Sequence, residues 1–228
     1  VAHAPASPVP EMKDTSAFMF GTAFAKICCV GAGWTDDLKT KRFSSTKGKM
    51  SIWEKNCPGN RFHFIFEDPV EIPNSGTTEG EFVAAINNNY PAPKARKEAN
   101  PSLKDSVNLR QFVDEERKRV KADWAFVIIS ITSWGRGYFA YMGGPYLCEV
   151  GDVDHETGHI FWAMDEYPGT AHVGDTKSGY FDSVNGNYLG TITKSCLMFN
   201  SWAAPAVLCS YTTMAVGWEM NSGGIPKL

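Results

Sequence analysis

The chain has 228 residues, of which 43% are hydrophobic and 21% are charged, and its formal net charge is −3. This length suits one good core or two unequal lobes around a cleft, and the composition is that of an ordinary globular protein. The small negative charge and the lack of a dense Lys/Arg block exclude nucleic acid as an expected partner. No run of about 18 apolar residues occurs, so no membrane span is expected. The residues from Val1 onward lack the pattern of a signal peptide.

The elements of the first half are predicted from periodicity and turn residues. Residues 1–16 are rich in Pro, Ala and Ser and predict an extended lead-in, and residues 17–30 predict a buried strand or a bulged pair of strands. A short helix is expected near 49–56, a turn at 57–60, and a second strand over 61–72 with Phe62, Phe64 and Phe66 on one face. Helices are expected over 79–87 and 106–120.

The second half begins with the most strand-like run, 124–131, which is apolar on both faces and therefore predicts a central strand. The Gly- and aromatic-rich segment 135–150 predicts an exposed strand at a cleft. Asp152 or Asp154 is expected to cap the helix that follows.

From 168 onward few periodic segments remain. We expect an α+β fold with a mixed twisted sheet over the helix that begins near 153. The expected parts are the lead-in (1–16), an N-terminal subdomain of sheet and helices (17–165) and an irregular C-terminal subdomain (166–228).

The strongest chemical signal in the chain is the run His155-Glu156-Thr157-Gly158-His159. Two histidines four residues apart stand one turn above the other on a helix, so both imidazoles can bind one metal ion. Glu156 would lie beside the metal, where it can take a proton from bound water. The alternative is that the motif is accidental and belongs to an ordinary helix surface.

A catalytic zinc site usually needs a third protein ligand, and Asp165 and Glu166 follow the motif. On a continued helix Glu166 would lie roughly 10 Å further along the axis than His159, at about 1.5 Å per residue. A ligand must come within about 2 Å of zinc. We therefore expect the helix to end soon after His159 and the chain to turn back, so that either carboxylate can bind.

The longer run HETGHIFWAMDEY resembles the signature of the metzincin family of zinc peptidases, HExxHxxGxxH or the same with a final Asp. Together with SGYFDSVNGNY and SCLMFNSW, it is similar to secreted bacterial peptidase-like proteins over about the second half of the chain. The resemblance implies a metzincin-like zincin fold with one Zn²⁺ held by His155, His159 and Asp165, and with Glu156 as general base. Trp162 stands where the family has a glycine, which predicts either a positive φ angle or a different turn.

The family also places a methionine in a tight turn under the metal, which makes Met198 the candidate; the alternative is an ordinary core methionine. Some members have a tyrosine two residues further on. Asn200 stands there, so the role of that tyrosine is either vacant or supplied from elsewhere, by Tyr167 or Tyr211.

The six cysteines form an even set without a CxxC pair, which favours disulfides or buried thiols over a zinc knuckle. Cys196 and Cys209 flank the expected methionine turn and enclose a short loop, and a disulfide between them is expected. Disulfides fit an extracellular location. The run Asp182-x-x-Asn185-Gly186-Asn187 has oxygen ligands spaced for Ca²⁺ but lacks the closing Glu of an EF-hand, so a polar turn is the favoured interpretation.

These features together predict an extracellular, monomeric, zinc-dependent endopeptidase that hydrolyses peptide or protein substrates with metal-activated water. The segment 137–146 would pair with an extended substrate through main-chain hydrogen bonds. The alternative is a non-catalytic zinc-binding or adhesion module on a zincin scaffold, and Trp162 is the main argument for it.

Overall fold

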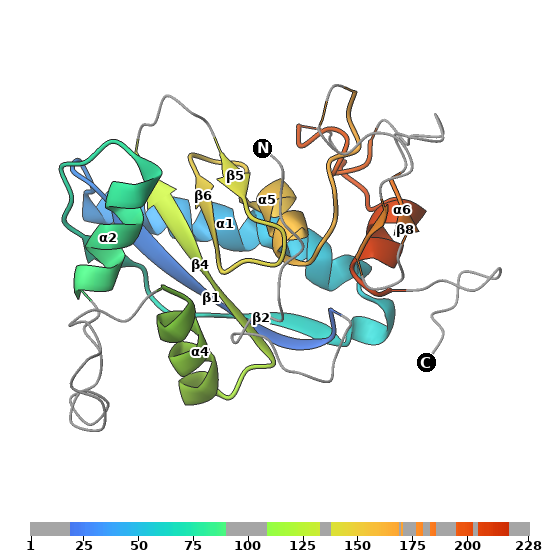
Figure 1. Cartoon of the computed structure of the whole chain (residues 1–228), viewed down its shortest axis with the longest axis horizontal. Coiled ribbons are helices and arrows are strands. Elements are labelled where there is room, and N and C mark those ends of the chain that lie inside the picture. Colours follow the sequence, from blue (N-terminus) through green and yellow to red (C-terminus); the bar gives the residue numbers. More distant parts are fainter. Residues whose placement is uncertain are drawn as a thin grey trace.

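The computed structural model describes residues 19–89, 109–132, 138–168, 170, 177–179, 183–185, 195–202 and 205–218. Within these ranges the chain is an α+β protein with a six-stranded mixed sheet and five α-helices (Figure 1). A small second sheet pairs β7 (Lys177–Ser178) with β8 (Ser183–Val184). Of the helices described, none has both the length and the apolar composition needed to cross a bilayer. The predicted lead-in lies outside the described residues.

Two apolar strands form the centre of the main sheet, β1 (Gly21–Val30) and β4 (Trp124–Ile131). They are parallel, and every residue of β4 is buried, as its apolar character on both faces predicts. The strand order is β2-β1-β4-β6-β5, where β2 spans Phe62–Phe66 and β6 spans Tyr146–Glu149. The short strand β5 (Phe139–Ala140) closes one edge antiparallel to β6, and β3 (Val70–Ile72) pairs with the end of β1.

Two segments differ from the strands predicted for them. The segment 61–72 is divided into β2 and β3, and Pro69, which cannot donate a ladder hydrogen bond, lies in the break. The segment 135–150 was predicted as one exposed strand, which is wrong for its described part: β5 and β6 are separate, and three of the four β6 residues are buried. A turn separates them because Gly143 and Gly144 both adopt positive φ angles.

Helices cover both faces of the sheet (Figure 1). On one face lie α1 (Asp36–Asn56) and α5 (Val153–Ile160), and on the other lie α2 (Glu79–Asn89) and α4 (Leu109–Val120). Alternate residues of β1 pack into the two hydrophobic cores, one on each face of the sheet, because successive strand side chains point to opposite faces. Ala25 and Ile27 belong to the core shared with α1 and α5, whereas Phe24 belongs to the core shared with α2 and α4.

Helix α1 is longer than the helix predicted near 49–56. It begins at Asp36, and the Thr35 side chain caps it by accepting a hydrogen bond from the Leu38 N–H at 3.2 Å. Only Thr46, Met50 and Trp53 of its 21 residues are buried, so the sequence carries little periodic signal for its first half. A 3₁₀ turn (Pro58–Asn60) follows, where a turn was predicted.

The C-terminal described segment returns to the start of the sheet. After α6 (Ser210–Ala215), the Val216 carbonyl accepts a hydrogen bond from the Met19 N–H at 2.9 Å. The Trp218 indole N–H donates to the Met19 carbonyl at 2.7 Å, and both residues are fully buried. The irregular part of the chain thus shares the core that supports α5.

Candidate metal centre

Helix α5 carries the HExxH motif, and all eight of its residues are buried. The Trp53 indole of α1 donates to the Asp154 carbonyl at 2.9 Å, which fixes the first turn of α5. Asp152 occupies the N-cap position, but its side chain makes no capping hydrogen bond. It accepts instead from Lys49 Nζ at 3.1 Å and from Ser201 Oγ at 3.0 Å. The start of the helix is therefore held mainly by side chains from other segments.

The helix ends directly after the second histidine. The Ala163 N–H donates to the Gly158 carbonyl at 2.9 Å and the Trp162 N–H to the His159 carbonyl at 3.1 Å, the two bonds of a Schellman C-cap. Trp162 has a φ of 72°, in the left-handed region that favours glycine. Of the two possibilities that the sequence left open at this position, the chain adopts the positive φ angle.

The indole of Trp162 packs closely over the β5–β6 turn. A Cβ added to Gly143 would lie 2.6 Å from Trp162 Cζ2, so only glycine fits beneath the ring. The Gly143 N–H also donates to the His159 carbonyl at 3.0 Å. This turn therefore supports the left-handed residue through packing and through a hydrogen bond.

The reversal at Trp162 brings Asp165 back to the two histidines. Asp165 Oδ1 lies 2.9 Å from His155 Nε2 and 3.3 Å from His159 Nε2. A tetrahedral ion with bonds of about 2.0–2.1 Å separates its ligand atoms by about 3.3 Å. Both distances from Asp165 to the histidines are therefore close to the spacing of two ligands of one ion. Glu166, the other carboxylate considered, faces Cys209 and Thr212 instead.

Hydrogen bonds to backbone carbonyls determine which nitrogen of each imidazole faces the candidate metal position. His155 Nδ1 donates to the Leu197 carbonyl at 2.9 Å, and His159 Nδ1 donates to the Ala163 carbonyl at 2.7 Å. Because a carbonyl can only accept, both Nδ1 atoms carry the proton and each Nε2 is directed to the metal position.

Asn185 supports the third side chain of this set. Its amide donates to the Asp165 carbonyl at 2.7 Å, and its side chain is buried. The sequence placed Asn185 in a calcium-like run and gave no signal for this contact. The other residues of that run, Asp182, Gly186 and Asn187, lie outside the described residues.

The charges of the three side chains depend on one another. Burial lowers the pKa of His159, but the hydrogen bond to Asp165 outweighs it, and the pKa is raised to about 9. The pKa of His155 is raised in the same way, against the effect of burial. Burial alone would raise the pKa of Asp165, yet the two imidazoles hold it well below its usual range. Since metal ligands bind without these protons, a cation would replace them.

Glu156 is the fourth polar side chain at the candidate metal position. It is 3% exposed, and one of its carboxylate oxygens lies within 4.8 Å of the ligand nitrogens of His155 and His159. Within the residues that the structure describes, its Oε2 is buried without a hydrogen-bond partner, and burial raises its pKa. A buried carboxylate oxygen without a partner is costly. An ion and its water at the two histidines would remove this cost, so the residues present fit a zinc ion.

Met198 lies directly against α5, between the two histidines. It is fully buried, and a Cβ added to Gly158 would lie 2.5 Å from Met198 Sδ. The turn that carries it is closed by a hydrogen bond from the Asn200 N–H to the Cys196 carbonyl at 2.8 Å. The preceding residue, Leu197, holds His155. This turn thus packs against the motif helix through Met198 and bonds to it through Leu197.

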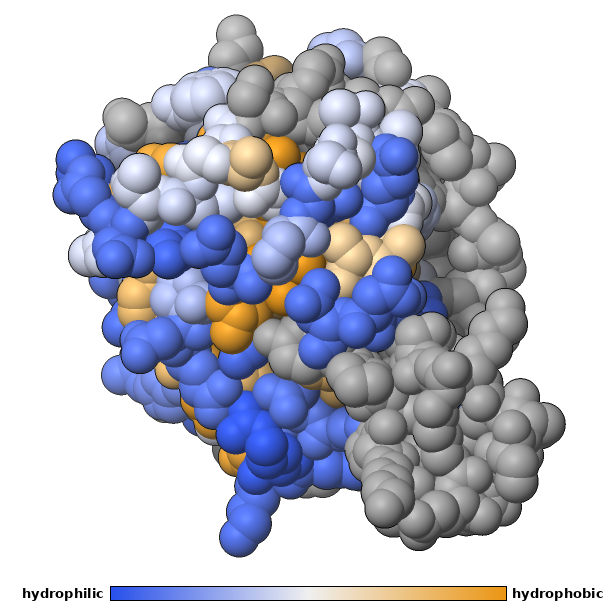
Figure 2. Space-filling model, turned by 90° about the vertical axis from the view of Figure 1, so that its left-hand side faces the viewer, coloured by the Kyte–Doolittle hydropathy of each residue, from blue (hydrophilic) through white to orange (hydrophobic). Residues whose placement is uncertain are grey.

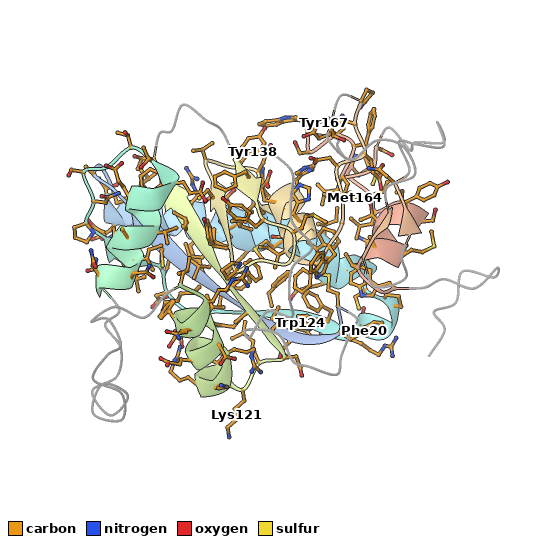
Figure 3. All side chains as sticks on the ribbon, viewed as in Figure 1. Phe20, Lys121, Trp124, Tyr138, Met164 and Tyr167 are labelled. Atoms are coloured by element: carbon orange, nitrogen blue, oxygen red, sulfur yellow. The ribbon has the colours of Figure 1, made fainter. Side chains whose placement is uncertain are left out.

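Of the two tyrosines considered, Tyr167 lies near the candidate ligands. Its ring centroid is 6.3 Å from that of His155, and its side chain is 41% exposed. Burial and the neighbouring Asp165 raise its pKa to about 12. Figure 3 shows Tyr167 and Tyr138 at the same end of the molecule. Tyr211 is in α6.

The six cysteines are all free in this structure. Burial raises the pKa of four of them, Cys28, Cys29 and Cys148 in the sheet and Cys57 at the end of α1. The disulfide expected between Cys196 and Cys209 is not formed, although the two sulfurs lie within 4.8 Å of each other.

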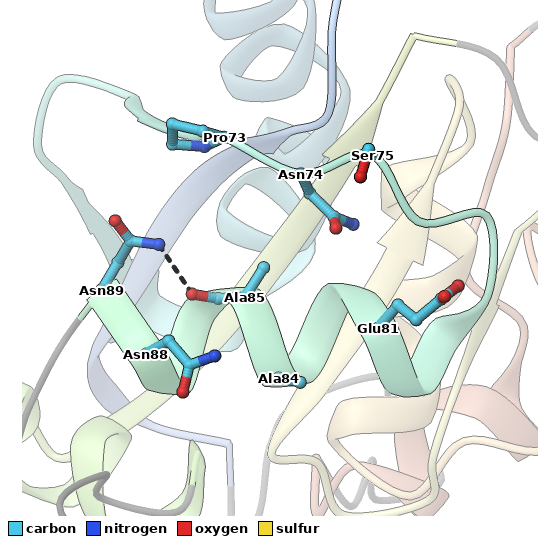
Figure 4. A pocket seen from close by; sticks show the side chains of 8 residues that line it. All are labelled: Pro73, Asn74, Ser75, Glu81, Ala84, Ala85, Asn88 and Asn89. Atoms are coloured by element: carbon cyan, nitrogen blue, oxygen red, sulfur yellow. Dashed lines mark hydrogen bonds between the residues drawn. The ribbon is translucent and has the colours of Figure 1, made fainter.

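A separate hollow lies between the segment 73–75 and α2 (Figure 4). Asn74, Glu81, Ala85 and Asn88 are among its lining residues, and none of the eight is a candidate ligand. The side of the molecule that carries α2 is mostly hydrophilic (Figure 2). This hollow is therefore distinct from the metal centre.

Comparison with known proteins assigns no family to the chain. No family model matches it, and no curated protein matches it. One similar solved structure, titled "Structure of a chaperone-substrate complex", is 14% identical, with a TM-score of 0.42. The match covers 71% of this chain and 26% of that chain, and a likeness at this level assigns neither a fold family nor a function.

Proposed function

We propose that the chain is a zinc-dependent endopeptidase with a metzincin-like fold, in which His155, His159 and Asp165 hold the ion. The observation that supports this most is the convergence of Asp165 Oδ1 on both Nε2 atoms, at 2.9 and 3.3 Å. Three protein ligands together with a water position are typical of catalytic rather than structural zinc sites.

Glu156 would be the proton carrier of this reaction. When bound, zinc supplies the charge that lowers the pKa of a water molecule and polarises the scissile carbonyl. Glu156, with its unpaired Oε2, would accept the proton of the attacking water and deliver it to the leaving amine. Burial raises the pKa of Glu156, which favours a carboxylate that holds the proton it accepts until it passes it to the leaving amine.

An extended substrate would bind along β5. This strand forms the edge of the sheet and is paired on one side with β6. The turn that follows it is bonded to His159, so the strand is fixed relative to the metal centre. A peptide could add to the edge through main-chain hydrogen bonds. The strand is shorter than the predicted segment 137–146, of which residue 137 lies outside the described residues.

The argument for a non-catalytic module depended on Trp162. Because Trp162 takes the left-handed conformation and the chain does return to the histidines, this argument loses its basis. We therefore keep hydrolysis as the proposed function, with peptides or proteins as substrates outside the cell.

Glu156→Gln tests this mechanism. The variant keeps the size and hydrogen-bonding capacity of the side chain, so zinc at the histidines should be retained. The rate at which a denatured protein library is cleaved should fall by about 10²–10⁴-fold, the usual effect of losing one general base. Asp154→Asn is the matched control, because Asp154 is also buried on α5 but lies outside the ligand cluster. It should keep both zinc and activity.

Two results would contradict the proposal. Full activity of Glu156→Gln would show that cleavage originates elsewhere. Stoichiometric zinc in the parent protein without any cleavage would leave only the zinc-binding module. A chelator should abolish the activity of the parent, and added zinc should restore it.

A further inference from the structure

A second group of polar side chains lies beside the metal centre and takes no part in the proposed reaction. Glu166, Cys196 and Cys209 each place one potential ligand atom within 4.8 Å of the other two. Cys209 Sγ lies 3.0 Å from Glu166 Oε1, and Thr212 Oγ1 lies 2.9 Å from the same oxygen. Three segments meet here: the residue after Asp165, the turn that carries Met198, and the first turn of α6.

This group combines acidic side chains with deep burial. Glu166 is 3% exposed, Cys196 is fully buried and Cys209 is partly buried. Within the described part of the chain, the carboxylate of Glu166 contacts only thiols and the Thr212 hydroxyl, and no cationic side chain pairs with it. A buried cluster of this kind is costly unless a cation compensates it.

The distances suit a small tetrahedral cation. With Zn–S bonds of about 2.3 Å and Zn–O bonds of about 2.0 Å, ligand atoms lie about 3.3–3.8 Å apart. Cys209 Sγ lies 3.0 and 3.2 Å from the two carboxylate oxygens of Glu166, and the three ligand atoms all lie within 4.8 Å of one another. The Cys209 N–H also donates to Cys196 Sγ at 3.4 Å, a contact that stabilises a thiolate.

We propose that Glu166, Cys196 and Cys209 form a second metal site for a thiophilic divalent cation such as Zn²⁺. Thiolates select such cations over Mg²⁺ or Ca²⁺. The two adjacent carboxylates then serve different ions, Asp165 the ion at the histidines and Glu166 the ion at the cysteines. The second site does not depend on peptidase activity.

The position of the site defines what it would stabilise. The Glu166 N–H donates to the Met198 carbonyl at 2.8 Å, so the same residue joins the Met198 turn through its backbone. A cation held by Glu166, Cys196 and Cys209 would fasten this turn and α6 to the segment that carries Asp165. It would cross-link the irregular C-terminal part where helices and strands are short.

Cobalt substitution of the full chain, purified under reducing conditions, separates the two sites. A thiolate ligand gives a sulfur-to-cobalt charge-transfer band in the near ultraviolet, which histidine and carboxylate ligands do not give. The parent should bind two ions per chain and show this band. Cys209→Ser and Glu166→Gln should bind one ion, and Cys209→Ser should lose most of the band. His159→Ala should also bind one ion but keep the band.

Cys57→Ser is the matched control, because Cys57 is a buried free thiol outside the cluster; it should keep both ions and the band. If Cys209→Ser fails to fold, X-ray absorption of the zinc-loaded parent still decides, because zinc–sulfur scattering at about 2.3 Å is expected. One ion per chain with no band and no sulfur scattering would overturn the proposal. So would a Cys196–Cys209 disulfide that forms while the reduced protein binds only one ion.

Discussion

Asp165 and Glu166 are adjacent in the chain, yet their carboxylates contact different partners. Asp165 accepts from two imidazoles, whereas Glu166 accepts from a thiol and a hydroxyl. The sequence could show only that both carboxylates were near enough to return to the histidines. The hydrogen bonds to the backbone of each residue, from Asn185 to the Asp165 carbonyl and from the Glu166 N–H to Met198, decide which one does.

Asp165→Ala should lose most of the zinc affinity of the histidine site, because it removes one of three protein ligands. The loss should exceed the roughly 10–100-fold typical for an outer-shell partner. Asn185→Ala, which removes the hydrogen bond to the Asp165 backbone but no ligand, should give a loss of that smaller size. Competition with a zinc-binding dye measures both. Unchanged affinity in Asp165→Ala would assign the third ligand to another residue.

At the scale of elements, the end of α5 is the feature that makes the site. The chain reverses at the left-handed Trp162, where two hydrogen bonds to helix carbonyls close the turn. The β5–β6 turn packs against the Trp162 ring. A non-glycine residue in this conformation stores strain of about 1–2 kcal/mol. The surrounding contacts must offset that strain.

A pair of substitutions at Trp162 should reveal the strain. Both Trp162→Gly and Trp162→Ala remove the indole, but only alanine keeps a Cβ at a positive φ angle. Trp162→Gly should therefore be more stable than Trp162→Ala by about 1 kcal/mol. Chemical denaturation of the two variants measures the difference. A more stable alanine variant would contradict the left-handed conformation at this position.

The contact between α5 and the Met198 turn gives a second test at this scale. Gly158→Ala would place a Cβ 2.5 Å from Met198 Sδ, so it should lower the free energy of unfolding by about 1–3 kcal/mol. Gly48→Ala is the matched control within α1, because an added Cβ there meets nothing within 4 Å. It should raise stability by up to about 1 kcal/mol, the usual gain of alanine over glycine in a helix. Equal effects at the two sites would exclude the packing described for Met198.

The elements that the sequence predicted well are those with a strong local signal. The run 124–131 is apolar throughout and forms the central strand, and Phe62, Phe64 and Phe66 lie on one face of β2, with neighbouring ring centroids 4.9 and 5.8 Å apart. Most of α1 was not predicted because its residues are largely exposed and polar, so its apolar residues form no helical period. The division of 135–150 depends on a glycine turn that packs against Trp162, and such a tertiary contact leaves no pattern in the sequence.

In the candidate site too, the sequence predicted the features that have a local signal and missed those that depend on tertiary contacts. The spacing of His155 and His159 on one helix predicts that they face one point, and the structure agrees. The cluster of Glu166 with Cys196 and Cys209 joins segments tens of residues apart, so sequence spacing suggested only the pairing of the two cysteines. Thr212 and Asn185 were missed because single polar side chains have no spacing to identify them.

At the scale of the whole molecule, the described ends of the chain are joined in one core. Trp218 is fully buried, packs against Trp53 with ring centroids 6.1 Å apart, and donates to the Met19 carbonyl. Trp53 in turn holds the first turn of α5. The C-terminal segment thus supports the motif helix through one intervening side chain.

Trp218→Ala should destabilise the protein by about 3–5 kcal/mol, the usual cost of removing a buried aromatic side chain. Trp202→Ala is the matched control, because Trp202 is 73% exposed, and it should change stability by less than about 0.5 kcal/mol. Thermal unfolding measures both variants. A loss below about 1 kcal/mol in Trp218→Ala would contradict the role given to this contact.

The hydrogen bonds of Met19 to Val216 and Trp218 also affect the order in which the protein can form during synthesis. The strand β1 leaves the ribosome before its partner β4 and before the residues that close its start, which follow about a hundred and two hundred positions later. At about 5–20 residues per second, that interval lasts many seconds. Pairings between such distant segments form slowly, and an apolar strand that waits for its neighbours is open to aggregation. The nascent chain therefore has to keep β1 from misassociating until translation has passed residue 218.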